Sequence, residues 1–109
     1  MMNLDRTFAA LSDPTRRAIL ARLALGEATA GELAEPFAIS QPAISRHLRV
    51  LESAALIERT RDGQHRRCSL LPLALKDAND WLSFYSRFWN EGFDRLDEHL
   101  KKTKGPIDE

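Results

Sequence analysis

The side chains best suited to bind a charged partner gather in the middle third of this sequence. Between residues 41 and 71 every basic side chain is an arginine, at Arg46, Arg49, Arg59, Arg61, Arg66 and Arg67. Only Glu52, Glu58 and Asp62 oppose them, so the segment has a net charge of +3 in a 109-residue chain whose formal net charge is zero. Guanidinium groups form paired hydrogen bonds with phosphates and guanine edges. The pattern favours a nucleic-acid partner, and a solvated basic surface is the alternative.

A helix predicted over residues 40–53 carries part of this charge. Ser40 is expected to cap it, with Pro42 in its first turn. The i, i+4, i+7 spacing of a buried face is met by Ile44, Leu48 and Leu51. At 100° per residue the opposite face presents Pro42, Ser45, Arg46 and Arg49. The helix therefore has one apolar face and one face of hydroxyl and guanidinium groups.

A helix of this kind fits the DNA major groove, where residues near its N-terminus meet base edges. Gln41 suits adenine, and Arg46 or Arg49 suits guanine. Ser45 can contact a phosphate or a base, and the helix N-terminus at Ser40 can receive a phosphate. We therefore expect this helix to read DNA.

Two points about this helix stay open. His47 lies on its flank, where it can contact a phosphate or pack against the protein. The whole polar face can also be an ordinary helix surface that meets only water.

A β-hairpin is predicted directly after this helix. Residues 56–61 and 65–70 are capable of forming strands, and an Asp-Gly pair at 62–63 separates them. Arginines on such a hairpin can reach phosphates or a narrow minor groove. The candidates are Arg59, Arg61 and Arg66, of which Arg61 lies nearest the tip of the first strand. A solvated ribbon is the alternative for any one of them.

Four further helices complete the expected fold. The first has Leu4, Phe8 and Leu11 on one face, and the second starts at Asp13 and Pro14. Thr29 and Glu32 match a capping box that opens a third. A long last helix is expected from Pro72 to about Leu100.

The predicted order is helix, helix, helix, helix, hairpin, helix. This is a mainly α fold with a small β-hairpin, a winged helix-turn-helix, in which helix 40–53 is the reading helix and residues 56–70 form the wing. We expect one DNA-binding and dimerisation domain over residues 1–100 and a disordered tail over 101–109.

Aromatic residues near the C-terminus predict a homodimer. The chain has five Phe, two Trp and one Tyr, and most of them lie between Trp81 and Phe93. This stripe is too wide for one neighbouring helix, although a core role could explain about half of it. The expected interface comprises Leu4, Phe8, Trp81, Phe84, Tyr85, Phe88, Trp89 and Gly92, the glycine allowing close helix approach. A two-fold dimer would place two reading helices about 34–36 Å apart, facing a palindromic operator in double-stranded DNA.

Three motifs resemble the ArsR/SmtB transcriptional regulators. They are LSDPTRRAIL at residues 11–20, GELA at 31–34 and SQPAISRHLRVL at 40–51. The resemblance extends from about Leu4 to Leu100. It implies a homodimeric bacterial repressor, joined through its first and last helices, that leaves its operator when an effector binds.

The sequence departs from the metal-sensing members of that family. No Cys-x-Cys-type pair occurs around Leu33, and His99 is the single histidine near the C-terminus. Zinc and thiophilic ions need nitrogen or sulfur donors, so we expect no metal and no cofactor, as in the subgroup without metal-binding boxes. Ala55 stands where relatives usually have Gly, and a left-handed conformation there would cost about 1 kcal/mol, so a different helix exit is expected.

Other classes of protein are disfavoured. An enzyme is disfavoured because the sequence shows neither a nucleophile–base pair nor a phosphate-binding glycine loop. No apolar run reaches the roughly 20 residues of a membrane span, and the first residues do not resemble a signal peptide, so a cytosolic protein is expected. Cys68, the single cysteine, is expected to be a small partly buried residue, with a redox thiol as the alternative. The competing function is a winged-helix module that binds protein instead of DNA, which the arginine cluster disfavours.

Overall fold

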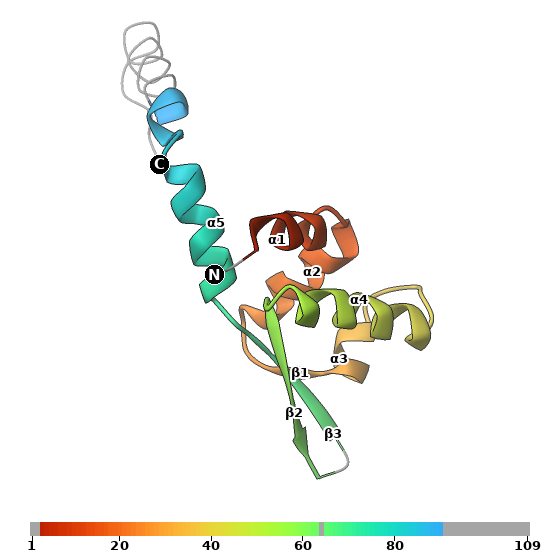
Figure 1. The fold of residues 1–109 in the computed structure, drawn as a ribbon. Coiled ribbons are helices and arrows are strands. Elements are labelled where there is room, and N and C mark those ends of the chain that lie inside the picture. The colour runs from red at the N-terminus through yellow and green to blue at the C-terminus, as the bar shows by residue number, and fades with distance from the viewer. Residues whose placement is uncertain (1–2, 64, 91–109) are drawn as a thin grey trace, which may run out of the picture. The chain divides into compact units, whose positions relative to one another are not determined.

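The computed structural model describes residues 3–63 and 65–90. Its elements are α1 (Leu4–Leu11), α2 (Pro14–Leu23), β1 (Ala28–Thr29), α3 (Ala30–Ala34), α4 (Gln41–Ser53), β2 (Ile57–Asp62), β3 (His65–Leu70) and α5 (Leu73–Ser83) (Figure 1). The predicted fold class, mainly helical with a small hairpin and a helix-turn-helix, is confirmed. The predicted order lacked one element, the short strand β1.

Strand β1 makes the hairpin a three-stranded antiparallel sheet with the order β1-β3-β2. Ala28 pairs with Cys68, and Thr29 pairs with Arg67. Thr29 also caps α3, since its hydroxyl accepts from the Glu32 amide at 3.2 Å while the Glu32 carboxylate accepts from the Thr29 amide at 2.9 Å. The expected capping box is thus confirmed. A two-residue strand is too short to show alternation, which is why β1 was not predicted.

The starts of α2 and α4 follow the local chemistry of the chain. The Asp13 carboxylate accepts from the backbone amide of Arg16 at 3.1 Å, and the Ser40 hydroxyl accepts from that of Ala43 at 3.3 Å. A proline stands in the first turn of each helix, where no amide donor is needed. Both predicted helix starts are confirmed.

The core lies between the helices and one face of the sheet. Its fully buried side chains include Ile19, Leu33, Ile44, Leu48, Leu51, Leu56, Ile57 and Cys68. The predicted inner face of α4 is therefore confirmed. Burial raises the pKa of the Cys68 thiol, which disfavours its thiolate and hence a redox role.

Helix α1 turns its small residues inward. Thr7 and Ala10 are buried, whereas Phe8 is exposed and Leu4 is only partly covered. Two large apolar side chains of α1 thus remain on the surface.

The exit from α4 passes through a left-handed residue. Ala55 has φ +58°, the only positive φ of a non-glycine residue in the described ranges. The amide of Leu56 then donates to the Leu51 carbonyl at 3.0 Å, which closes the helix end. The expectation that an alanine would change this exit is wrong, because the chain keeps the left-handed geometry with alanine in place.

The last helix is interrupted, contrary to the prediction of one continuous element. Helix α5 ends at Ser83, residues 84–85 form a turn, and residues 86–90 are helical again. The hydroxyls of Ser83 and Ser86 donate to backbone carbonyls at 2.8 Å each. Serine hydroxyls compete with the helix for its own hydrogen bonds, and aromatic residues at 84–85 are weak helix formers, so the regular pattern fails there.

The chain divides into two compact units, Met1–Ala78 and Asn79–Glu109. The first contains the helix-turn-helix and the wing. The expected tail over residues 101–109 lies outside the described residues.

Candidate nucleic-acid interface

The outward face of α4 carries the polar side chains that the sequence singled out. Gln41, Pro42, Arg46 and Arg49 are exposed, and Ser45 is half-buried. The helix packs its leucines and isoleucine inward, so this face is held outward by the core. It has the size and polarity of a helix that enters a major groove.

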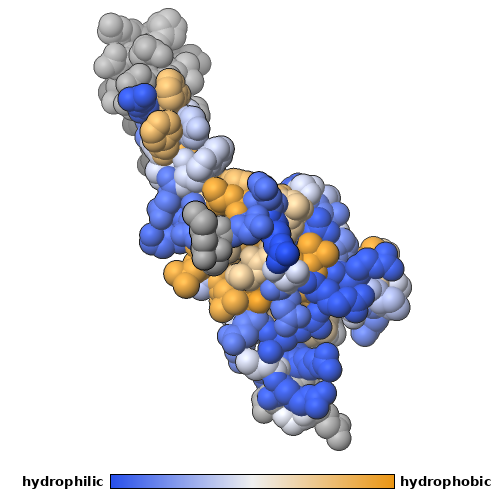
Figure 2. Space-filling view, in the orientation of Figure 1, coloured by the Kyte–Doolittle hydropathy of each residue, from blue (hydrophilic) through white to orange (hydrophobic). Residues whose placement is uncertain are grey.

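The wing brings two arginines opposite each other near its tip. In the register of β2 and β3, Arg61 pairs with Arg66 and Asp62 pairs with His65. Gly63 has φ +63°, a conformation suited to a tight hairpin turn. Both arginines are exposed, and Figure 2 shows hydrophilic residues covering the wing. Like charges directly opposite each other on a sheet repel, and a bound anion would relieve this repulsion.

Arg59 has a different place from the other wing arginines. It lies opposite Cys68, on the face of the sheet that covers the core. Its side chain is only 14% exposed, and its Nε lies 3.4 Å from Oε1 of Glu52 on α4. Nε and Nη2 are buried without a hydrogen-bond partner among the described residues. Arg59 thus joins the wing to α4 by an ion pair, and Nη2 keeps a free donor.

A groove of about 460 Å³ lies between α4 and the wing. The side chains around it include Ser45, Arg49, Arg59, Arg61 and Arg66. Residues of α4, β2 and β3 that were predicted to contact DNA therefore line the same groove. Glu52 also lines it but is engaged by Arg59.

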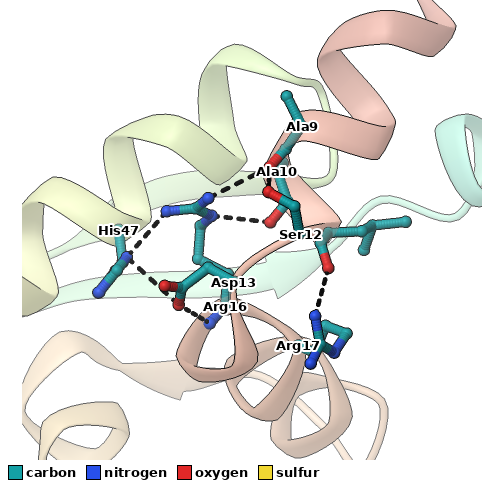
Figure 3. A network of polar contacts seen from close by, with 8 residues as sticks. Ala9, Ala10, Ser12, Asp13, Arg16, Arg17 and His47 are labelled. Atoms are coloured by element: carbon teal, nitrogen blue, oxygen red, sulfur yellow. Dashed lines mark hydrogen bonds and ion pairs between the residues drawn. The ribbon is translucent and has the colours of Figure 1, made fainter.

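His47 is not among the residues that line this groove. Its Nδ1 lies 3.2 Å from Nη1 of Arg16 and 3.9 Å from Oδ2 of Asp13, and its side chain is 20% exposed (Figure 3). Because an arginine can only donate, Nδ1 accepts, which assigns the neutral ring its proton on Nε2. Of the two alternatives left open for His47, the geometry favours packing.

Arg16 is a residue that sequence reasoning missed. Besides contacting His47, its Nε donates to the carbonyl of Ala10 at 2.7 Å and its Nη2 to that of Ala9 at 3.2 Å (Figure 3). These carbonyls end α1, so one side chain ties α1 and α2 to the reading helix. The hydrogen bond from the Arg16 amide lowers the pKa of Asp13. No local pattern could reveal this contact, because Arg16 and His47 are far apart in the sequence.

The described arginines fall into two groups. Contacts within the protein engage Arg16, Arg17, Arg22, Arg59, Arg67 and Arg87. The exposed guanidinium groups without an ion-pair, hydrogen-bond or ring partner among residues 3–63 and 65–90 are those of Arg6, Arg46, Arg49, Arg61 and Arg66. This second group surrounds α4.

The aromatic stripe is exposed. Phe84 and Phe88 are 70% and 60% exposed, and Trp81, Tyr85 and Trp89 are exposed as well. Trp81 contacts Tyr85 with tilted rings whose centres are 5.1 Å apart, and Phe84 meets Tyr85 edge-on at 4.9 Å. The exposure of these five side chains does not favour the alternative that about half of them fill the core. Gly92, also expected at the interface, lies outside the described residues.

Within the described residues, no group of three or more His, Cys, Asp or Glu side chains is placed to hold a metal ion. In the same part of the chain, no helix combines the length and apolar character that crossing a bilayer requires.

A helix-turn-helix with a basic outer face, followed by a basic wing, defines a winged-helix DNA-binding protein. Residues 11–60 match the family model described as a helix-turn-helix domain. The chain is 46% identical over 79 residues to the transcriptional repressor SdpR of Bacillus subtilis, covering 72% of this chain and 88% of that protein. It is 44% identical over 85 residues to the HTH-type transcriptional regulator Rv2034 of Mycobacterium tuberculosis, covering 78% and 77%.

Solved structures agree with these relatives. The ArsR family transcriptional regulator RHA00566 is 37% identical with a TM-score of 0.74, over 80% of this chain and 96% of that one. An ArsR-like regulator from Rhodococcus sp. RHA1 is 31% identical with a TM-score of 0.68, over 95% and 94%. The chain therefore belongs to the ArsR/SmtB family of winged helix-turn-helix regulators, as its motifs indicated, and is a DNA-binding transcriptional regulator.

Proposed function

We propose that this protein is a homodimeric repressor that acts in the cytoplasm and binds a palindromic operator in double-stranded DNA. Helix α4 reads base edges in the major groove through Gln41, Ser45, Arg46 and Arg49. Arg61 and Arg66 of the wing hold the neighbouring sugar-phosphate backbone.

The observation that carries this proposal is that the arginines around α4 are exposed and unpaired. Arg49, Arg61 and Arg66 line one groove with exposed guanidinium groups that have no partner among the described residues. Repulsion among them is a cost that the protein alone does not offset. A polyanion offsets it, and the DNA backbone carries a charge about every 1.7 Å along the duplex.

The dimer follows from the exposed aromatic residues. An isolated protein rarely leaves several large rings on one short segment facing water, because each exposed ring forgoes the free energy of burial. Phe8 on α1 is exposed too. A second copy of the chain is the partner that makes the two-fold operator arrangement possible.

Arg59 and His47 take supporting parts in this proposal. Arg59 fixes the wing to α4 through its ion pair with Glu52. His47 is a positioning residue for α4, because its ring contacts Arg16 and Asp13.

The direct test is a titration of the protein into a labelled duplex taken from the DNA upstream of its own gene, with a shuffled duplex as control. We expect tighter binding to the upstream duplex, with a complex mass of two chains per duplex by light scattering. Binding that ignores DNA and selects a protein partner instead would overturn the proposal in favour of the interaction module.

A further inference from the structure

A second groove lies on the α1 side of α4. It has a volume of about 440 Å³, and its walls include Arg6 and Arg16, together with Arg46 and Arg49 of α4. Its floor is built from small or apolar residues such as Ala9 and Val50. No carboxylate is among the residues that line it, so the groove is cationic throughout.

Three of these four arginines are available to a ligand. Arg16 is occupied by the carbonyls that end α1 and by His47. Arg6, Arg46 and Arg49 are exposed, and no described residue pairs with their guanidinium groups. Arg46 and Arg49 are also like charges at i and i+3 on one helix, an arrangement that is unfavourable unless an anion lies nearby.

This groove is continuous with the proposed DNA surface through one residue. Arg49 lines both the groove beside the wing and the groove beside α1. The unpaired arginines thus follow one track, from the wing tip across α4 to the first helix. Because these arginines extend over two grooves, they fit an extended sugar-phosphate backbone better than a single compact anion.

We propose that the groove between α1 and α4 binds a backbone phosphate of the DNA, with Arg6 as a contact outside both the helix-turn-helix and the wing. The inference rests on the proposed function. It gives the first helix a direct part in DNA binding through the turn that carries Arg6.

The test uses the dependence of binding on salt, because neutralising one phosphate releases counterions whatever the base sequence. The full-length protein and its Arg6→Gln variant are titrated into a labelled 30-base-pair duplex of arbitrary sequence at several KCl concentrations. Glutamine keeps helix propensity at this exposed site and removes only the charge. Two matched variants accompany it. Arg61→Gln reports on the wing, and Lys76→Gln removes one charge from α5, outside both grooves.

We expect Arg6→Gln to reduce the slope of log K against log salt by about 0.9 for each bound subunit, as Arg61→Gln does, and Lys76→Gln to leave it unchanged. An unchanged slope for Arg6→Gln beside a reduced slope for Arg61→Gln would overturn this inference while the interface of α4 and the wing stands. Loss of inorganic phosphate binding in Arg6→Gln, with a normal DNA slope, would overturn it too, in favour of a free-anion site. If the unmodified protein binds neither this duplex nor its upstream DNA, the proposed function itself fails.

Discussion

Arg16 and His47 join two helices that the sequence separates widely. Nη1 of Arg16 lies 3.2 Å from Nδ1 of His47, while the rest of the same guanidinium group caps the end of α1. The orientation of the reading helix therefore depends on a side chain of α2 that also contacts the end of α1.

Replacing His47 by Ala should affect folding more than DNA contact. We expect a loss of about 1 kcal/mol in the free energy of unfolding, because one part-buried hydrogen bond disappears. The salt slope of DNA binding should stay at its wild-type value, since His47 holds α4 in place and touches no phosphate. Urea denaturation and salt titration measure the two quantities. A slope reduced by about one phosphate contact would show instead that His47 binds the backbone.

Arg46 should discriminate between base pairs. Arg46→Ala is expected to weaken binding to the cognate operator by roughly 1–3 kcal/mol and to relax the preference at one base-pair position, because a guanidinium pairs with a guanine edge. Competition with duplexes substituted one base pair at a time measures this. Arg66→Ala is the matched comparison and should weaken all these duplexes equally. Equal weakening by both variants would remove Arg46 from base reading.

The exposed aromatic residues should hold the dimer together. Phe88→Ser is expected to weaken dimerisation by about 2 kcal/mol or more, which is roughly thirtyfold in the dissociation constant. Leu25, 85% exposed between α2 and β1, supplies the control Leu25→Ser, which should change nothing. Sedimentation velocity reports both. A wild-type protein that sediments as one chain at about 10 μM would contradict the proposed dimer.

Ala55 offers a stabilising substitution. With φ at +58°, its methyl group opposes the left-handed conformation, so Ala55→Gly should raise the free energy of unfolding by up to about 1 kcal/mol. Ala54, with φ at −87°, gains nothing from glycine, and Ala54→Gly should lower stability by roughly 0.5–1 kcal/mol. Equal effects at the two positions would show that left-handed strain is not the cause.

Asp13 should contribute to acid sensitivity. Its pKa is lowered in the folded protein, first by the hydrogen bond from the Arg16 amide. The stabilisation is therefore present above the unfolded pKa and is lost as the pH falls through the folded one. Asp13→Asn keeps a capping oxygen without the charge, so its stability should fall less steeply as the pH falls through and below the ordinary aspartate pKa of 3.8. Parallel curves for the two proteins, measured by urea denaturation, would contradict this assignment.

Much of the fold follows from short-range signals. The caps at Asp13, Thr29 and Ser40 act within three residues, and the inner face of α4 repeats every turn, so both are legible in the sequence. The turn at residues 84–85 was not predicted, because it depends on hydroxyls competing for carbonyls within one regular apolar pattern.

For the candidate site, the sequence predicted which arginines are exposed on α4 and at the wing tip better than it predicted how the side chains pack. Residue types and spacing on α4 and the wing named the arginines. They could not tell that Arg59 turns toward Glu52 or that Arg6 approaches α4, because both depend on how separate elements pack.

The pairing of β1 with β3 has a mechanical consequence. The wing is fastened to the body at its base by Ala28 and Thr29 on one side and by the ion pair of Arg59 with Glu52 on the other. The wing is therefore held to the rest of the protein along both of its strands. If α4 contacts bases and the wing contacts phosphates as proposed, the protein sets the number of base pairs between the two contacts, and one inserted base pair there would weaken binding.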